Sequence, residues 1–386
     1  MSTSSSDDPP GPRRIFELGD QALEVATHPS SSLFAASLIN GEVVCLSYPP
    51  DPDTSSVDEE DSEKGQEAFR IKEHKKSCRS LDFSMDGADR SWNSVDVSTG
   101  KIIHSELRSH EKGINRIRCL NERMIATGDD DGVVKIWDQR THQAVQTYHD
   151  NEDFISSFAF QPQKKQLLAA GGDGYLSVFD IRKPNLVARS DNLDDELLSV
   201  QIIKNGKKVV VGTQDGVLAF FTYGNWGDIN DRFVGHPSSV DALCKVDEDT
   251  VLSGSSDGLI RVCGLLPNRM YGVVGAQDMP VECLTMDHSR QWLLSLGHDD
   301  LVRFWDVKFL THEEDEQCEE QGDTLATGEA TESKKRSVEG EPQDVSKPGP
   351  ANDLLPSKKK KKAARIEAKE RTEKAVQDQA SFFSDL

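Results

Sequence analysis

Short runs of alternating apolar and polar residues recur along the middle of the chain at a nearly constant spacing. Acidic turns starting at 89, 131, 173, 215, 257 and 299 are 42 residues apart. Eight-residue alternating runs follow the last five turns: VVKIWDQR, YLSVFDIR, VLAFFTYG, LIRVCGLL and LVRFWDVK. Period-two alternation in runs of this length is typical of β-strands. A period near 42 with about four strands in each unit predicts an all-β fold, the β-propeller.

The number of repeats predicts seven blades between residues 13 and 310. Third-strand runs stand at 42–48, 92–97, 133–138, 175–180, 217–222, 259–264 and 301–306. The last blade has no fourth strand of its own, because the sequence becomes acidic soon after residue 308. The segment RRIFELG at 13–19 can supply that strand and remove the open sheet edges at both ends of the chain. We therefore expect an N-terminal strand to close the ring.

The second blade is short. From Asn40 to Asp89 the chain has about 32 residues outside an acidic insertion, which is some ten fewer than the period. The text CRSLDFSMDG runs from a first strand directly into the turn before the third, so the second strand is expected to be missing. Either the blade has three strands, or the sequence reflects an altered transcript or gene model. The second alternative is favoured, because a three-stranded blade would leave a gap in the ring.

Polar segments flank the repeats and interrupt them once. Residues 1–12 are rich in Ser, Asp, Pro and Gly and are expected to be disordered. Residues 50–67 form an acidic loop insertion. A disordered acidic and polar linker is expected over 311–357, and a basic tail over 358–386 that ends in FFSDL and in which any short helix is marginal.

Composition excludes several classes of protein. The chain has 67 Asp and Glu against 45 Lys and Arg, a net charge of −22, which disfavours nucleic-acid binding by the whole surface. No apolar run is long enough to span a membrane, and the N-terminus lacks the apolar segment of a signal peptide. The seven cysteines stand singly, so neither a zinc site nor a disulfide framework is expected. Nucleophile, phosphate-loop and metalloprotease motifs are missing, so we expect no enzyme activity and no cofactor.

Trp-Asp dipeptides at 137–138 and 305–306 resemble those that name the WD-repeat family. In the blade that contains the first of them, four residues match that family's structural tetrad: His110, Thr127, Asp131 and Trp137. The resemblance implies that these side chains form a buried, satisfied polar network and take no part in catalysis.

Several fragments together resemble the WD repeat-containing protein 55 family. They are ATGDDDGVVKIWDQR, SCRSLDFS, DRFV, LPNR, GHDDLVRFWD and the basic tail ending FFSDL. The resemblance implies a protein of the nucleus and nucleolus that acts in ribosome biogenesis and rRNA processing. It also implies a monomer within larger complexes, with pre-ribosomal factors as its protein partners.

One stretch favours an alternative function. Residues 125–140, IATGDDDGVVKIWDQR, resemble the box through which WD-repeat substrate receptors bind the adaptor of CUL4-type cullin-RING ubiquitin ligases. Asp131, Trp137, Asp138 and Arg140 match that box, and Arg140 would offer its planar guanidinium to backbone carbonyls or carboxylates. The same pattern also occurs in ordinary blades, where the arginine pairs with an acid of a neighbouring strand.

Other candidate contact residues lie near predicted strand ends or in loops, where propellers bind their partners. They are Arg79, Arg116, Arg182, Asn268 and Arg269. Trp226, in YGNWGDIND, either serves as a binding anchor or folds back under its own loop.

Basic clusters in the tail are candidate nuclear-localisation signals, and RNA contact is expected only there. They consist of Lys334, Lys335 and Arg336, and of Lys358, Lys359, Lys360, Lys361 and Lys362.

Overall fold

The computed structural model describes residues 10–49, 66–72, 74, 77–83, 85–88, 91–106 and 108–311, without the side chains at 85–88, 91 and 92. Residues 1–9 of the predicted disordered N-terminus, residues 50–65 of the acidic loop, residues 312–357 of the predicted linker and the basic tail lie outside these residues.

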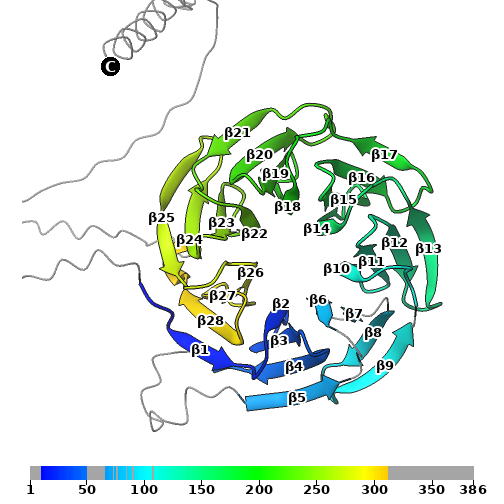
Figure 1. The fold of residues 1–386 in the computed structure, drawn as a ribbon, viewed down its shortest axis with the longest axis vertical. Helices are drawn as coiled ribbons and strands as arrows, with labels where there is room; N and C mark the ends of the chain where they lie inside the picture. Colours follow the sequence, from blue (N-terminus) through cyan, green and yellow to red (C-terminus); the bar gives the residue numbers. More distant parts are fainter. Residues whose placement is uncertain are drawn as a thin grey trace, which may run out of the picture. The chain divides into compact units, whose positions relative to one another are not determined.

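Seven four-stranded antiparallel sheets form a ring in the described part of the chain (Figure 1), and first-strand residues such as Glu24, Arg116 and Asp241 line a channel at its centre. Each sheet is one blade, and its first strand lies nearest the channel (Figure 1). The first four blades contain β2 (Ala22–Thr27), β3 (Leu33–Leu38), β4 (Glu42–Ser47) and β5 (Gln66–Lys72); β6 (Cys78–Asp82), β7 (Met85–Ala88), β8 (Ser91–Asp96) and β9 (Lys101–Glu106); β10 (Ile114–Asn121), β11 (Met124–Asp129), β12 (Val134–Asp138) and β13 (Gln143–Tyr148); β14 (Ile155–Gln161), β15 (Gln166–Gly171), β16 (Leu176–Asp180) and β17 (Leu186–Arg189).

The last three blades complete the ring. They contain β18 (Leu197–Ile203), β19 (Lys208–Thr213), β20 (Val217–Thr222) and β21 (Asp231–Val234); β22 (Val240–Lys245), β23 (Thr250–Ser255), β24 (Leu259–Gly264) and β25 (Arg269–Ala276); β26 (Cys283–Met286), β27 (Trp292–Leu296) and β28 (Leu301–Asp306), with β1 (Arg14–Glu17) as the outermost strand. A short helix, α1 (Lys308–Thr311), follows β28.

The repeated acidic turns join the second and third strands of their blades, as the sequence pattern predicts. In four consecutive blades the residue after the aspartate is a glycine with a φ between 77° and 81°. A side chain is strained in this left-handed region. At Gly132 a Cβ atom would also lie 2.7 Å from the carbonyl oxygens of Asn151 and Asp153. The turn thus contacts the next loop too closely for any residue but glycine.

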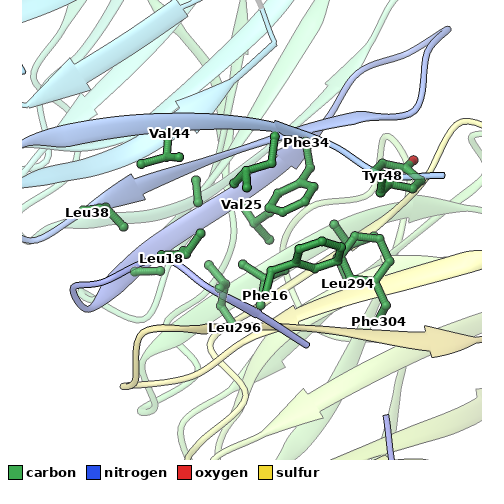
Figure 2. Packing of buried hydrophobic residues seen from close by; sticks show 14 of the residues in the cluster. Phe16, Leu18, Val25, Phe34, Leu38, Val44, Tyr48, Leu294, Leu296 and Phe304 are labelled. Atoms are coloured by element: carbon green, nitrogen blue, oxygen red, sulfur yellow. The ribbon is translucent and has the colours of Figure 1, made fainter. Parts of the chain in front are cut away.

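The N-terminal strand closes the ring, which confirms that prediction. β1 pairs with β28 in the register Arg14 opposite Phe304 and Glu17 opposite Leu301. The side chain of Phe16 is buried between the last and first blades, with ring centroids 5.0 Å from Phe304 and 5.4 Å from Phe34 (Figure 2). Phe16 therefore packs against Phe34 of the first blade and Phe304 of the last, which are 270 residues apart in the sequence.

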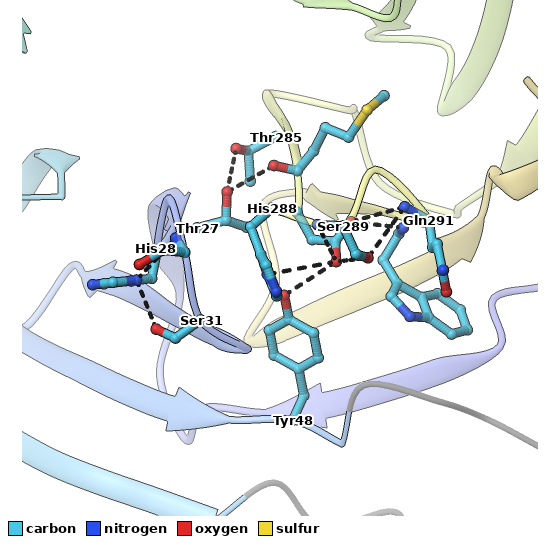
Figure 3. A network of polar contacts seen from close by, with 12 residues as sticks. Thr27, His28, Ser31, Tyr48, Thr285, His288, Ser289 and Gln291 are labelled. Atoms are coloured by element: carbon cyan, nitrogen blue, oxygen red, sulfur yellow. Dashed lines mark hydrogen bonds and ion pairs between the residues drawn. The ribbon is translucent and has the colours of Figure 1, made fainter. Parts of the chain in front are cut away.

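Polar contacts join the same two blades (Figure 3). The Thr27 hydroxyl donates a hydrogen bond to the carbonyl oxygen of Met286 at 2.7 Å, and the Tyr48 hydroxyl donates one to Asp287 at 3.5 Å. Asp287 is buried, and its carboxylate accepts bonds from the backbone N–H of Trp292 and from the Ser289 hydroxyl. Because the carboxylate is satisfied by its own turn, it can be buried at this junction at little cost.

The predicted fold class, a seven-bladed propeller whose second blade lacks a strand, is wrong in that blade. β7 occupies the second-strand position and pairs with β6 through Cys78 opposite Ala88, and with β8 through Gly87 opposite Trp92. The other six sheets are described with all of their side chains. In the second blade several side chains are not described, but its four strands pair through their backbones like those of the other blades. The four residues of β7 supply the second strand within the short segment, so the blade has four strands without any added sequence.

Closure by β1 predicts that alanine substitutions at two neighbouring positions of that strand change the free energy of unfolding by very different amounts. Phe16→Ala should lower the free energy of unfolding by about 3–5 kcal/mol, because it removes a buried ring from the junction of two blades. Ile15→Ala is the matched control, since Ile15 is 45% exposed on the other face of the strand. It should change the free energy by less than about 1 kcal/mol. Urea unfolding measures both, and equal effects would contradict this account of closure.

Candidate partner-binding faces of the propeller

Antiparallel strand order divides the loops between two faces of the ring. We call upper the face with the turns between second and third strands and the connections between blades. We call lower the face with the turns between first and second strands and between third and fourth strands. Both faces surround the channel, and loops on a rigid scaffold are where propellers present contact residues.

A buried network beneath the upper face organises the third blade. His110 Nδ1 lies 2.8 Å from Asp129 Oδ2, and His110 Nε2 lies 2.6 Å from the Thr127 hydroxyl. Trp137 Nε1 donates to the same hydroxyl at 2.8 Å. Because the carboxylate accepts from Nδ1–H, the Thr127 hydroxyl donates to Nε2 and accepts from the indole. Each polar atom along this path has a partner, which makes the network a structural one.

The charges of the two titratable groups agree with that arrangement. Burial lowers the pKa of His110, against the opposing effect of Asp129, so the imidazole is neutral at pH 7. Burial opposes ionisation of Asp129, but hydrogen bonds from His110 and from the backbone N–H of Val133 lower the pKa of its carboxyl group. The pair is therefore a neutral imidazole that donates to a carboxylate.

The tetrad predicted from the sequence contained Asp131, and the structure corrects it to Asp129. Side chains two residues apart on a strand share a face, so Thr127 and Asp129 of β11 both point into the network. Asp131 lies beyond the strand, in the turn, where its half-exposed side chain forms an ion pair with Lys112 at 3.2 Å. Three consecutive aspartates made the choice ambiguous, and only the end of the strand resolves it.

Other blades carry partial versions of this network. His236 Nε2 lies 2.8 Å from the Ser253 hydroxyl, but Cys263 stands where the third blade has tryptophan. In the last blade Trp305 Nε1 donates to the Ser295 hydroxyl at 2.8 Å. Burial lowers the pKa of His236 to about 4, so this imidazole is also neutral. Among the described residues, the complete tetrad occurs in the third blade.

The upper mouth of the channel is a hollow of about 470 Å³, and two predicted contact residues line it. Arg79 Nη1 donates to Asp130 at 2.8 Å and to the Asn115 side chain at 2.9 Å. Arg116 of the third blade donates through Nη1 to Glu24 of the first blade at 2.8 Å. Both guanidinium groups are thereby held in place while remaining partly exposed.

The later blades contribute apolar and acidic side chains to the mouth. The fourth blade contributes Phe154 and the fifth Leu198, both half-buried. The sixth blade contributes Asp241 and the seventh Glu282. Burial raises the pKa of Asp241 to about 6. The sequence-based search missed these four residues. They stand at the start of successive first strands, 41 to 44 positions apart, so aligning the repeats would have found them.

Two similar Asp-x-Arg hairpins lie on the lower face, between the third and fourth strands of neighbouring blades. Arg140 binds Asp138 through Nε at 3.0 Å and Nη2 at 2.6 Å. Arg182 binds Asp180 in the same way, at 2.8 and 2.7 Å. These bonds lower the pKa of both aspartates to about 2. The arginine side chains are still 62% and 63% exposed, so each can contact a partner.

The remaining predicted contact residues have structural neighbours. Trp226 folds back into the core of its blades: it is 7% exposed and meets Tyr223 edge-on with ring centroids 4.7 Å apart. It is therefore no surface anchor. Asn268 Nδ2 donates to Asp231 at 2.8 Å, and the guanidinium of Arg269 lies 5.6 Å from the Tyr271 ring. The basic residues of the predicted localisation signals lie outside the described part of the chain.

The described residues contain no group of three or more His, Cys, Asp or Glu side chains placed to hold a metal ion. None of their helices has the length and apolar character of a membrane span.

The ring of four-stranded blades, the Trp-Asp dipeptides and the His–Thr–Trp–Asp network define a WD-repeat β-propeller. The WDR55 family model matches residues 12–310, and the chain belongs to that family. It is 39% identical to WD repeat-containing protein 55 of Arabidopsis thaliana, over 76% of this chain and 82% of the relative. It is 38% identical to WD repeat-containing protein JIP5 of Coprinopsis cinerea, over 77% and 74%. The mouse WD repeat-containing protein 55 is 34% identical, over 74% and 73%.

The corrected tetrad predicts a large loss of stability on substitution of one aspartate and a small loss on substitution of its near neighbour. Asp129→Ala should lower the free energy of unfolding by about 2–4 kcal/mol, because it removes the partner of a buried imidazole. Asp131→Ala breaks only an exposed ion pair and should cost less than about 1 kcal/mol. Thermal or urea unfolding of the two variants checks this, and a larger effect at Asp131 would restore the original assignment.

Proposed function

We propose that this protein is a non-catalytic scaffold of the nucleus and nucleolus that acts in ribosome biogenesis and rRNA processing. Membership of the WDR55 family carries the proposal, because the resemblance to that family implies this role. A closed ring with rigid loops suits a scaffold, since WD-repeat propellers mediate protein–protein interactions. Its partners would be pre-ribosomal factors, bound by a monomer within a larger complex.

The upper mouth is the surface that best fits a protein partner. It places half-buried Phe154 and Leu198 beside the fixed guanidinium groups of Arg79 and Arg116. Apolar side chains at the centre of a contact and arginines around them are typical of residues that dominate binding energy. The positions of both arginines are fixed by ion pairs, so little conformational entropy would be lost on binding.

The basic tail would serve localisation and any RNA contact. Lys334, Lys335, Arg336 and the lysines at 358–362 supply the positive charge that the propeller, with its acidic balance, does not. Contact with RNA through these residues would involve phosphates and would weaken with salt.

A second candidate function is that of a substrate receptor for a CUL4-type cullin-RING ubiquitin ligase. The observation that favours it is the pair of exposed arginines, Arg140 and Arg182, on one face of neighbouring blades. Each is held by its own aspartate with the guanidinium plane fixed, which suits recognition of carbonyls or carboxylates on an adaptor.

One affinity purification with mass spectrometry tests both functions. Wild type should recover pre-ribosomal factors, and Leu198→Asp should recover at least fivefold less, because it places a charge in the mouth. Val187→Asp is the matched control: Val187 is 42% exposed on the outer strand of the fourth blade, and this variant should behave as wild type. Arg140→Ala with Arg182→Ala should change recovery of cullin and its adaptor only.

The outcomes separate the two readings. Pre-ribosomal factors missing from the wild-type sample would contradict the scaffold role. Equal recovery of the adaptor by wild type and the double arginine variant, or none from either, would remove the receptor role. Deleting 334–374 in the same experiment should disperse the protein from the nucleus, and unchanged nuclear accumulation would contradict the role given to the tail.

A further inference from the structure

The lower face contains a second hollow, unrelated to the predicted contact residues. It has a volume of about 700 Å³ and lies where the turns between first and second strands of the fourth, fifth and sixth blades meet the channel. Four basic side chains line it: Arg118, Lys164, Lys207 and Lys245. Gln161, Gln163, Gln201 and Asn205 supply further hydrogen-bonding groups. We call this site the basic hollow.

The basic hollow carries excess positive charge. Its one acidic lining residue, Glu248, is already bound to Lys245 at 2.6 Å. Lys164 Nζ lies 3.6 Å from the centroid of the Tyr223 ring, which holds its position without neutralising its charge. Among the described residues, neither Lys164 nor Lys207 has a carboxylate within 4.0 Å. Residues 1–310 have 49 acids and 32 bases, so this local balance opposes that of the propeller.

The described chain ends beside the rim of this hollow. The Thr311 hydroxyl donates to the carbonyl oxygen of Arg290 at 3.1 Å, and Arg290 Nη2 donates to the carbonyl oxygen of Val246 at 2.5 Å. Val246 follows Lys245, a lining residue. Thr311 is therefore separated from the rim by a single arginine side chain.

The next residues of the sequence have the complementary charge. His312 is followed by four consecutive acids, Glu313, Glu314, Asp315 and Glu316. Five residues in extended form span roughly 16 Å at about 3.3 Å each, enough to pass the rim from Thr311. We propose that the acidic segment 313–316 binds in the basic hollow, its carboxylates against Lys164, Lys207 and Arg118.

Tethering makes this contact effective although each ion pair is weak. Exposed pairs contribute about 0–1 kcal/mol each. A short tether, however, gives the segment a millimolar effective concentration, with which a separate anion has to compete. The hollow is then a docking site for carboxylate-rich peptides that the chain itself occupies. Salt should weaken the contact, because the charges are only partly buried.

Zero-length cross-linking of the full chain with a carbodiimide tests the contact directly. At low salt, amide bonds should join residues 313–316 to Lys164, Lys207 or Lys245, and 0.5 M NaCl should reduce their yield severalfold. The Lys112–Asp131 ion pair on the upper face is an internal control for the reaction. Cross-links from 313–316 to exposed Lys101 or Lys112 at an equal yield, or none to the hollow, would overturn the proposal.

A binding measurement in trans supplies the second readout. Labelled hexaglutamate should bind at least tenfold more tightly to the full chain carrying Glu313→Gln, Glu314→Gln, Asp315→Asn and Glu316→Gln than to wild type. Adding Lys164→Glu and Lys207→Glu should abolish that gain, whereas adding Lys101→Glu and Lys112→Glu should keep it. Equal affinities of hexaglutamate for wild type and for the variant with the four neutralised acids would contradict the proposal. So would a hollow that binds oligouridine and not hexaglutamate, which would assign it to nucleic acid.

Discussion

The pairing of β1 with β28 is the constraint on which the rest of the structure depends. Each blade buries its apolar faces only against its two neighbours, so a ring with one open junction would expose the faces of both the first and the last blade. Phe16, between Phe34 and Phe304, covers that junction, and the bonds of Thr27 and Tyr48 to the last blade add to it. Both faces, and every loop on them, owe their fixed positions to this closure.

The features that could be predicted from the sequence are those that follow from its periodicity. The 42-residue spacing and the Asp-Gly turns placed the strands of most blades, and RRIFELG was recognised as the closing strand because the last blade lacked one. β7 was missed because Met85–Ala88 has no β-branched or aromatic residue, and its pairing with β6 and β8 overrides that weak propensity. Asp129 was missed because its role depends on where β11 ends, which charge patterns do not reveal.

Charge is distributed unevenly over the two faces of the ring. The upper mouth combines fixed arginines with Phe154 and Leu198, which suits a protein surface. The lower face has two exposed arginines in Asp-x-Arg hairpins and, nearer the channel, the basic hollow beside the chain's exit at Thr311. None of these features requires a reaction, and all of them require that the blades keep their relative positions.

Hydrogen exchange of the full-length protein tests closure most directly. The backbone N–H groups of Arg13 and Leu18 bond to the carbonyl oxygens of Phe304 and Asp300, both at 2.8 Å, and β1 pairs with β28 between them. The amides of Arg13 and Leu18, which bond to residues of β28 and its preceding turn, should therefore exchange as slowly as the bonded amides of β3, in the middle of the first blade. Exchange at the rate of an unstructured peptide, while β3 remains protected, would show that the ring is not closed by its N-terminal strand.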